Sequence, residues 1–92
     1  MIRSFRCKDT ASLFDGACPA RFRSFRQKAE RKLVLLHAAE TIEFLRSPPG
    51  NRLEKLTGDR RNSWSLRINH QWRLCFRFER GNAFDVEIVD YH

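Results

Sequence analysis

Two arginines and a histidine are the residues of this chain best suited to chemistry on a phosphate group. Arg67 and Arg73 stand in a run of alternating polar and apolar residues, and His92 is the last residue of the sequence. Cleavage of RNA by its own 2′-hydroxyl needs a base for the hydroxyl proton, an acid for the leaving 5′-oxygen, and cations around the phosphate. Guanidinium groups can clamp the phosphate but do not serve readily as bases, because they stay protonated.

His92 is suited to proton transfer, because an imidazole holds both protonation states near neutral pH. Its own α-carboxylate favours the protonated form, so we expect it to act as the acid. Tyr91 can stack on a base or donate a hydrogen bond to the phosphate. The chemistry requires no metal, and no cofactor is predicted. A terminal histidine is more commonly solvated than catalytic, so the residue types alone leave both interpretations open.

The composition predicts one folded domain over residues 1–92. The chain has 92 residues, 41% of them hydrophobic, with eight Phe, two Trp and a formal net charge of +7. An excess of arginine favours an anionic partner, nucleic acid before a membrane. Three separated cysteines without a C-x-x-C pair predict neither a disulfide framework nor a zinc site, and they favour the reducing cytoplasm. Since no long apolar run is present, neither a secretion signal nor a membrane span is expected.

Helical periodicity dominates the first half of the chain. Residues 2–6 alternate as a short strand, and Asp9 or Thr10 can cap a helical turn that reaches Phe14. From about Arg21, apolar residues recur at spacings of three and four, which predicts one long amphipathic helix as far as Leu45. The prolines of 48–49 end that helix, and a short strand is expected over residues 51–56.

Strict alternation in the second half predicts a β-hairpin followed by a last strand. In WSLRINHQWRLCFRF and in the final strand, the expected inward residues are Trp64, Leu66, Ile68, Trp72, Leu74, Phe76, Phe78, Phe84, Val86 and Ile88. These residues form an apolar face for the helix. The second face then carries Arg67, Arg73, Arg77 and, if the alternation continues, Tyr91.

The basic residues concentrate on the loop and the middle strands of this predicted sheet. Nine basic and three acidic residues lie between Arg46 and Arg80, whereas the last strand has no Lys or Arg. Lys55, Arg61 and Arg77 are therefore candidate RNA contacts. An ordinary solvated surface is the alternative interpretation.

The runs SPPGNRLEKL, GDRRNSWSLRINHQWRLCFRF and VEIVDYH closely resemble the HigB-type toxins of bacterial type II toxin–antitoxin systems, in the RelE/ParE superfamily. The resemblance covers the whole chain. It implies an α+β fold, with a small antiparallel-rich sheet packed on one face by N-terminal helices, the RelE-like microbial ribonuclease fold. It also implies a ribosome-dependent endoribonuclease, an mRNA interferase that cuts mRNA in the ribosomal A site and inhibits translation.

The resemblance also implies roles for individual residues. By position, the active-site arginines of the family correspond to Arg67 and Arg73, and its terminal catalytic residues correspond to Asp90, Tyr91 and His92. Arg60, in the Gly-Asp-Arg loop, is implied as a contact for mRNA or small-subunit ribosomal RNA. The implied partners are the ribosome and a cognate HigA-like antitoxin with a helix-turn-helix domain.

One departure from the family pattern concerns the start of the Gly-Asp-Arg loop. Relatives often carry a lysine where this chain has Thr57. Lys55 is a possible substitute. The departure predicts a weaker or more ribosome-dependent nuclease.

Two other functions fit the same residues. A ParE-like toxin would poison DNA gyrase without enzymatic activity, since one fold can host both functions. A basic RNA-binding module would bind RNA with a steep salt dependence and leave it uncut. Breaks in DNA with intact mRNA would indicate the first function, and mRNA ends placed at codons would indicate the nuclease.

Overall fold

The computed structural model describes residues 1–47, 49–57 and 62–90. Helical elements come first and strands follow, which confirms the predicted α+β class. The elements are α1 (Lys8–Phe14), the 3₁₀ helix η1 (Ala20–Phe25), α2 (Arg26–Ala38), α3 (Ile42–Arg46), the 3₁₀ helix η2 (Pro49–Asn51), β1 (Glu54–Lys55), β2 (Ser63–Arg67), β3 (Trp72–Glu79) and β4 (Asn82–Asp90).

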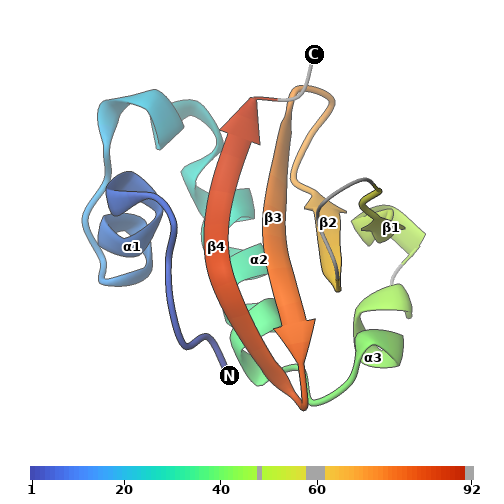
Figure 1. Cartoon of the computed structure of the whole chain (residues 1–92). Helices are drawn as coiled ribbons and strands as arrows, with labels where there is room; N and C mark the ends of the chain where they lie inside the picture. Colours follow the sequence, from blue (N-terminus) through green and yellow to red (C-terminus); the bar gives the residue numbers. More distant parts are fainter. Residues whose placement is uncertain (48, 58–61, 91–92) are drawn as a thin grey trace.

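The four strands form one antiparallel sheet in the order β1-β2-β3-β4. Figure 1 shows α2 crossing behind β3 and β4, while the labelled helices leave the face towards the viewer uncovered. We call this side the helix-free face. The turn from β3 to β4 places Arg80 at φ 52° and Gly81 at φ 80°. Two successive left-handed residues are typical of the turn that matches the twist of a two-stranded hairpin.

The predicted alternation sets the two faces of β2 and β3. Opposite residues pair as Leu66 with Leu74 on the helix side and as Arg67 with Arg73 on the helix-free face. The fully or nearly fully buried core on the helix side includes Phe22, Leu33, Leu36, Leu66, Leu74, Phe76, Val86 and Ile88. Apolar burial of this kind is the main stabilising term of a small domain, and the assignment of Arg67, Arg73 and Arg77 to the other face is confirmed.

The prediction that Phe84 points into the core is wrong. The pairing of β3 with β4 shifts between Cys75 and Arg77, so that Phe84 lies opposite Arg77 and Ala83 lies opposite Phe78. Asp85, at φ 54°, is the extra residue of this bulge, and its backbone N–H donates to Ser4 Oγ over 2.9 Å. A bulge inverts the alternation on one side of it. Ala83 is therefore fully buried, and Phe84 moves to the helix-free face.

The single long helix predicted from Arg21 to Leu45 is also wrong, because the structure divides it into η1, α2 and α3. Ala39 is extended, with ψ 129°, and ends α2. Thr41 then caps α3, since its side chain accepts a hydrogen bond from the N–H of Phe44 over 3.2 Å. All three helices bury their apolar residues in the same core. The apolar residues therefore keep a nearly helical spacing in the sequence even though the helix is interrupted at Ala39.

The two short strands predicted over residues 2–6 and 51–56 are confirmed only in part. Residues Ile2 and Phe5 form isolated parallel bridges with β4, at Ala83 and Val86. The stretch expected as a strand over residues 51–56 contains the end of η2 and the two-residue β1. Within the described ranges, no helix is long and apolar enough to cross a membrane.

Candidate functional site

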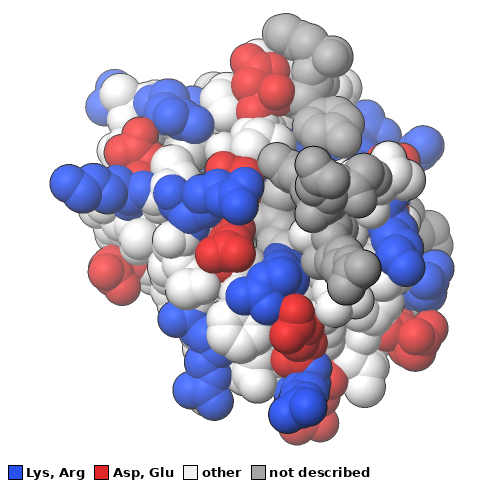
Figure 2. All heavy atoms as spheres, viewed as in Figure 1, with Lys and Arg blue, Asp and Glu red and all other residues white. Residues whose placement is uncertain are grey.

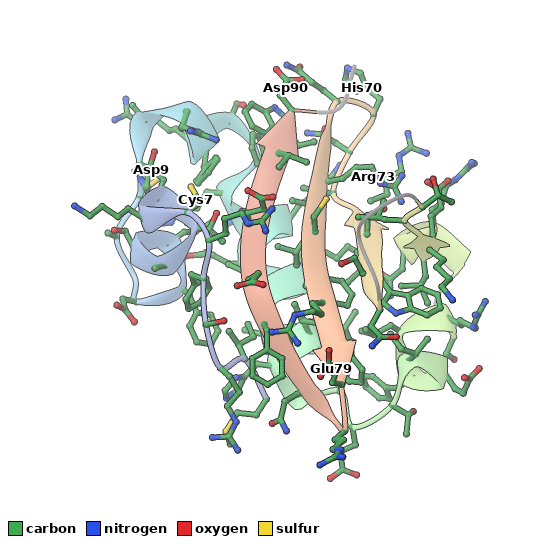
Figure 3. The ribbon with its side chains drawn as sticks, viewed as in Figure 1. Cys7, Asp9, His70, Arg73, Glu79 and Asp90 are labelled. Carbon is green, nitrogen blue, oxygen red and sulfur yellow. The ribbon has the colours of Figure 1, made fainter. Side chains whose placement is uncertain are left out.

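Arg67 and Arg73 lie opposite each other on β2 and β3, at the end of the sheet where these strands are joined. Figure 3 shows Arg73 near this end, with His70 and Asp90 at the tip, whereas Glu79 lies at the far end. The close spacing of opposed residues in an antiparallel pair brings the two arginines together.

Arg73 is buried, with 8% of its surface exposed. Its Nε donates to Ser65 Oγ over 2.9 Å, and its Nη2 donates to the backbone carbonyl of Arg52 over 2.6 Å. Glu54 Oε1 lies 3.5 Å from the same Nη2 and supplies a counter-charge. A planar guanidinium held by several acceptors has a fixed orientation. The alternation of polar and apolar residues suggests a solvent-exposed arginine at this position, whereas Arg73 is buried and held in place.

Arg67 is only partly buried and lines a surface hollow of about 560 Å³. The residues around this hollow, which we call the basic hollow, are Lys28, Gly50, Arg52, Arg67, Ile68, Asn69 and His70. None of them is acidic. In the part of the chain that the structure describes, no carboxylate forms an ion pair with Lys28, Arg52 or Arg67. As far as the described residues go, the hollow therefore offers an anion positive charge that no carboxylate neutralises.

The turn beside the basic hollow is held by Asn69. Its Oδ1 accepts hydrogen bonds from the N–H groups of Gln71 and Trp72, each over 2.8 Å. Asparagine favours such turns because its side chain can replace a backbone acceptor. His70 is left exposed at the tip. His70 was not among the residues that the sequence predicted for the site, although it lines the basic hollow.

Asp90 ends β4 at the same end of the sheet, opposite Trp72. Its Oδ2 accepts a hydrogen bond from Gln71 Nε2 over 3.1 Å, and its side chain is exposed. Asp90 thus lies at the same end of the sheet as Arg67 and Arg73. By the alternation of β4, however, its side chain belongs to the helix side of the sheet, as does that of Trp72. The predicted residues Tyr91, His92, Arg60 and Arg61 lie outside the described residues.

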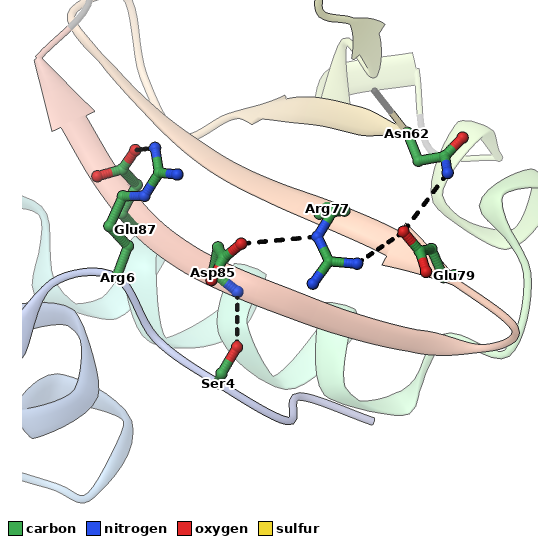
Figure 4. A network of polar contacts seen from close by, with 7 residues as sticks. All are labelled: Ser4, Arg6, Asn62, Arg77, Glu79, Asp85 and Glu87. Atoms are coloured by element: carbon green, nitrogen blue, oxygen red, sulfur yellow. Dashed lines mark hydrogen bonds and ion pairs between the residues drawn. The ribbon is translucent and has the colours of Figure 1, made fainter. Parts of the chain in front are cut away.

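Arg77 lies at the opposite end of the helix-free face, among acids. Its Nη1 is 2.6 Å from Glu79 Oε2, its Nε is 3.6 Å from Asp85 Oδ2, and its guanidinium carbon is 4.6 Å from the centre of the Phe84 ring. Figure 4 shows this network, which Asn62 extends, and a separate Arg6 to Glu87 pair beside it. The hydrogen bond from Arg77 lowers the pKa of Glu79, and the same bond raises that of Arg77.

The two ends of the helix-free face therefore differ in charge. Around Arg77 the basic and acidic side chains alternate, and Figure 2 shows blue and red spheres in contact over the lower part of this face. Because the local charges cancel, this end attracts a polyanion less than the basic hollow does. The structure groups Arg67 and Arg73 and places Arg77 apart from them.

Lys55 also lies apart from the two arginines. It pairs with Trp64 in the sheet register, and its Nζ is 5.8 Å from the centre of the Trp64 ring. Trp64 is on the helix side of β2, so Lys55 is on the side opposite Arg67. Among the described residues, no cluster of three His, Cys, Asp or Glu side chains could hold a metal ion.

The sequence of this chain matches a known protein family. A model of the family described as RelE-like toxin of type II toxin–antitoxin system HigB matches residues 15–92. The chain belongs to this HigB-like toxin family. The match includes every described residue of the basic hollow and all four strands.

Individual relatives of this HigB-like chain agree with the family match. Toxin HigB-1 of Vibrio cholerae is 46% identical over 56 residues, which cover 61% of this chain and 59% of the relative. A Haemophilus influenzae protein is 45% identical over 53 residues, or 58% of this chain and 52% of that protein. The match thus spans less than two thirds of either relative. Endoribonuclease HigB of Proteus vulgaris is 30% identical over 94 residues, with both chains fully covered.

A solved structure supports the fold. The YoeB-YefM complex from Staphylococcus aureus includes a chain that superposes with a TM-score of 0.51, at 16% identity, over 100% of this chain and 98% of the other. At this level of identity the likeness supports the RelE-like arrangement of helices and sheet, and function has to be argued from the site.

Proposed function

We propose that this HigB-like chain is a toxin with endoribonuclease activity that cuts mRNA on the ribosome. The observation that carries the proposal is the position of Arg67, opposite the fixed Arg73 and on the edge of the basic hollow. The name of the Proteus vulgaris relative, Endoribonuclease HigB, supports the same reaction. Arg67 forms no ion pair with any carboxylate in the described ranges, so its guanidinium is available to a phosphate that gains charge in the transition state.

The proposed reaction is an attack by the 2′-oxygen of RNA on its neighbouring phosphorus. The 2′-hydroxyl proton passes to a general base, the new phosphorus–oxygen bond closes a 2′,3′-cyclic phosphate, and the bond to the 5′-oxygen breaks. We assign His92 as the acid that protonates this leaving oxygen, with Tyr91 stacking on a base. No step of this reaction needs a metal ion, so we propose that it is metal-independent.

The two arginines have different roles in this proposal. Arg67, which is accessible from the basic hollow, contacts the reacting phosphate. Arg73, which is buried against Ser65 and the Arg52 carbonyl, positions the loop beside it. The predicted RNA contacts at Arg60 and Arg61 remain predictions, and so does the catalytic role of Asp90.

We also propose the partners that the family description suggests. A type II toxin has a protein antitoxin, which supports a cognate HigA-like partner with a helix-turn-helix domain. Action on translating ribosomes would place the toxin in the cytoplasm, in contact with mRNA and small-subunit ribosomal RNA. A net charge of +7 favours such polyanionic partners.

Mapping of mRNA 5′ ends after brief expression tests the function. The wild type should produce new ends at fixed positions within codons, and Arg67→Gln and His92→Gln should abolish them. Arg46→Gln is a matched control, because Arg46 is exposed on α3, where it pairs with Glu43 and lies over the Trp64 ring, and it is not among the residues that line the basic hollow. DNA breaks and an SOS response with intact mRNA would instead indicate a gyrase poison and overturn the proposal.

A further inference from the structure

A second hollow lies next to the basic hollow. It has a volume of about 500 Å³ and is lined by Arg23, Ser24, Phe25, Arg26, Gln27, Lys28 and Asn69. Lys28 and Asn69 line both hollows. The two hollows are therefore neighbours, and together they extend from Arg67, past the turn between β2 and β3, to the end of η1 and the first turn of α2. We call the two hollows together the basic track.

The basic track carries positive charge along its length. Within the described ranges, Arg23, Lys28, Arg52 and Arg67 form no ion pair, and Arg26 alone of the lining cations is paired, with Glu30 at 3.2 Å. Burial lowers the pKa of Lys32, one turn beyond Lys28, and the charges of Arg31 and Lys28 lower it further. Of these three cations Lys28 lines the track, so the positive charge on this part of α2 adds to that of the track and favours a bound anion.

The apolar residues of the basic track are covered by their own neighbours. Phe25 and Ile68 have only 6% and 5% of their surface exposed. Protein interfaces depend on accessible aromatic or aliphatic anchors that fill pockets on the partner. The track offers guanidinium, ammonium, amide and imidazole groups instead. This chemistry fits a chain of phosphates better than the apolar side of an antitoxin helix.

We propose that the basic track binds the RNA backbone beside the cleavage point, with Lys28, Arg52 and Arg23 each contacting a phosphate and Arg67 contacting the reacting one. The inference rests on the proposed nuclease function, and it adds the path of the RNA on the toxin. Arg23 and Lys28 come from η1 and α2, far in sequence from Arg67. They bind RNA without regard to base identity, because phosphates carry no sequence information.

Binding of an uncleavable RNA tests the track separately from the chemistry. Fluorescence anisotropy of a short single-stranded 2′-O-methyl RNA gives the dissociation constant over a series of potassium chloride concentrations. Lys28→Gln, Arg52→Gln and Arg23→Gln should each weaken binding, and each should reduce the slope of log affinity against log salt by about 0.7, the value for one phosphate on a single strand. Lys8→Gln, an exposed lysine of α1 outside the track, is the matched control and should bind as the wild type does.

The outcomes separate this inference from the proposed function. If the three variants bind RNA with the affinity and salt slope of Lys8→Gln, the track is wrong, whether or not the wild type cuts mRNA. If the variants lose affinity for the cognate antitoxin and keep their affinity for RNA, the partner is a protein and the inference is overturned. If the variants lose RNA affinity as expected but the wild type does not cut mRNA, the track stands and the nuclease assignment fails.

Discussion

The guanidinium of Arg73 donates a hydrogen bond from Nη2 to the backbone carbonyl of Arg52 over 2.6 Å and so ties β3 to the loop beside the basic hollow. Arg52 has a φ of 43°, a left-handed conformation that residues other than glycine rarely adopt. Nearby, buried Asn51 accepts a hydrogen bond from Lys32 and donates one to the carbonyl of Leu45 over 3.1 Å. The loop is thus fastened from β3, α2 and α3, and these contacts hold Arg52 at the hollow.

Arg73→Lys should therefore destabilise the fold. A lysine ammonium cannot reproduce the planar fork that reaches Ser65 Oγ and the Arg52 carbonyl together. Loss of hydrogen bonds from a buried charged group should lower the free energy of unfolding by about 1.5–3 kcal/mol, measured by urea denaturation. Arg67→Lys is the control, and it should change the free energy of unfolding by no more than about 0.5 kcal/mol, because Arg67 makes no ion pair among the described residues.

The positioning role of Arg73 predicts that its effect on RNA binding is not additive with that of Arg52. If Arg73 acts by holding the Arg52 backbone, Arg52→Gln should weaken RNA binding when it is made in the wild type. The same substitution should weaken binding much less when it is made in the Arg73→Lys variant. The four dissociation constants of this double-mutant cycle give the result. Full additivity would contradict the positioning role and would favour a separate phosphate contact by Arg73.

Glu79→Gln should remove part of the pH dependence of stability. Hydrogen bonds from Arg77 and then Asn62 hold the pKa of Glu79 below its ordinary value of 4.5. A carboxyl group with a lowered folded-state pKa stabilises the fold above its unfolded pKa, and this stabilisation is lost as the pH falls through the folded pKa. The wild type should therefore exceed Glu79→Gln in free energy of unfolding at neutral pH, and the difference should shrink as the pH falls below 4.5 and vanish below the lowered folded-state pKa of Glu79. A difference of the same size at neutral and at acidic pH would contradict the ion pair.

Alternation in the sequence was enough to predict the two faces of β2 and β3. Side chains on these strands follow a strict period of two, and the register from Ser63–Arg77 to Arg67–Arg73 keeps it. The bulge at Asp85 was not predictable, because one inserted residue leaves an acceptable alternation on each side of it. The break at Ala39 was also missed, because alanine has the highest helix propensity and so gives no signal that a helix ends there.

The candidate site was predicted less completely than the fold. Arg67 and Arg73 were identified because they are neighbours on one hairpin, whereas Lys28 and Arg52 reach the basic hollow from α2 and from the loop after η2. Contacts between elements far apart in sequence depend on tertiary packing, which local patterns do not encode. The excess of cations at the start of α2 was the one available signal, and it suited a solvated helix equally well.

Because the bulge places Ala83 in the core and Phe84 on the helix-free face, truncating Phe84 and truncating Phe76 should lower the free energy of unfolding by different amounts. Phe84 is half-buried on the helix-free face beside Arg77, whereas Phe76 is 2% exposed in the core. Phe76→Ala should lower the free energy of unfolding by about 3–5 kcal/mol. Phe84→Ala should cost about 1 kcal/mol, from partial burial and the lost contact with the guanidinium. Urea denaturation measures both, and equal costs would place Phe84 in the core, as the simple alternation predicts.

Gly81→Ala should destabilise the hairpin that carries β4 to the site. Gly81 has a φ of 80°, and a Cβ there would lie 3.2 Å from the backbone oxygen of Glu40, in the break between α2 and α3. A left-handed alanine costs about 1–2 kcal/mol, and the close backbone oxygen adds to this cost. Gly50→Ala is the matched control, because a Cβ at Gly50 meets nothing within 4 Å. It should be neutral or slightly stabilising, since alanine reduces the entropy of the unfolded chain. Thermal unfolding of both variants measures the difference. Similar melting temperatures would mean that the conformation of Gly81 and its close approach to Glu40 do not require glycine.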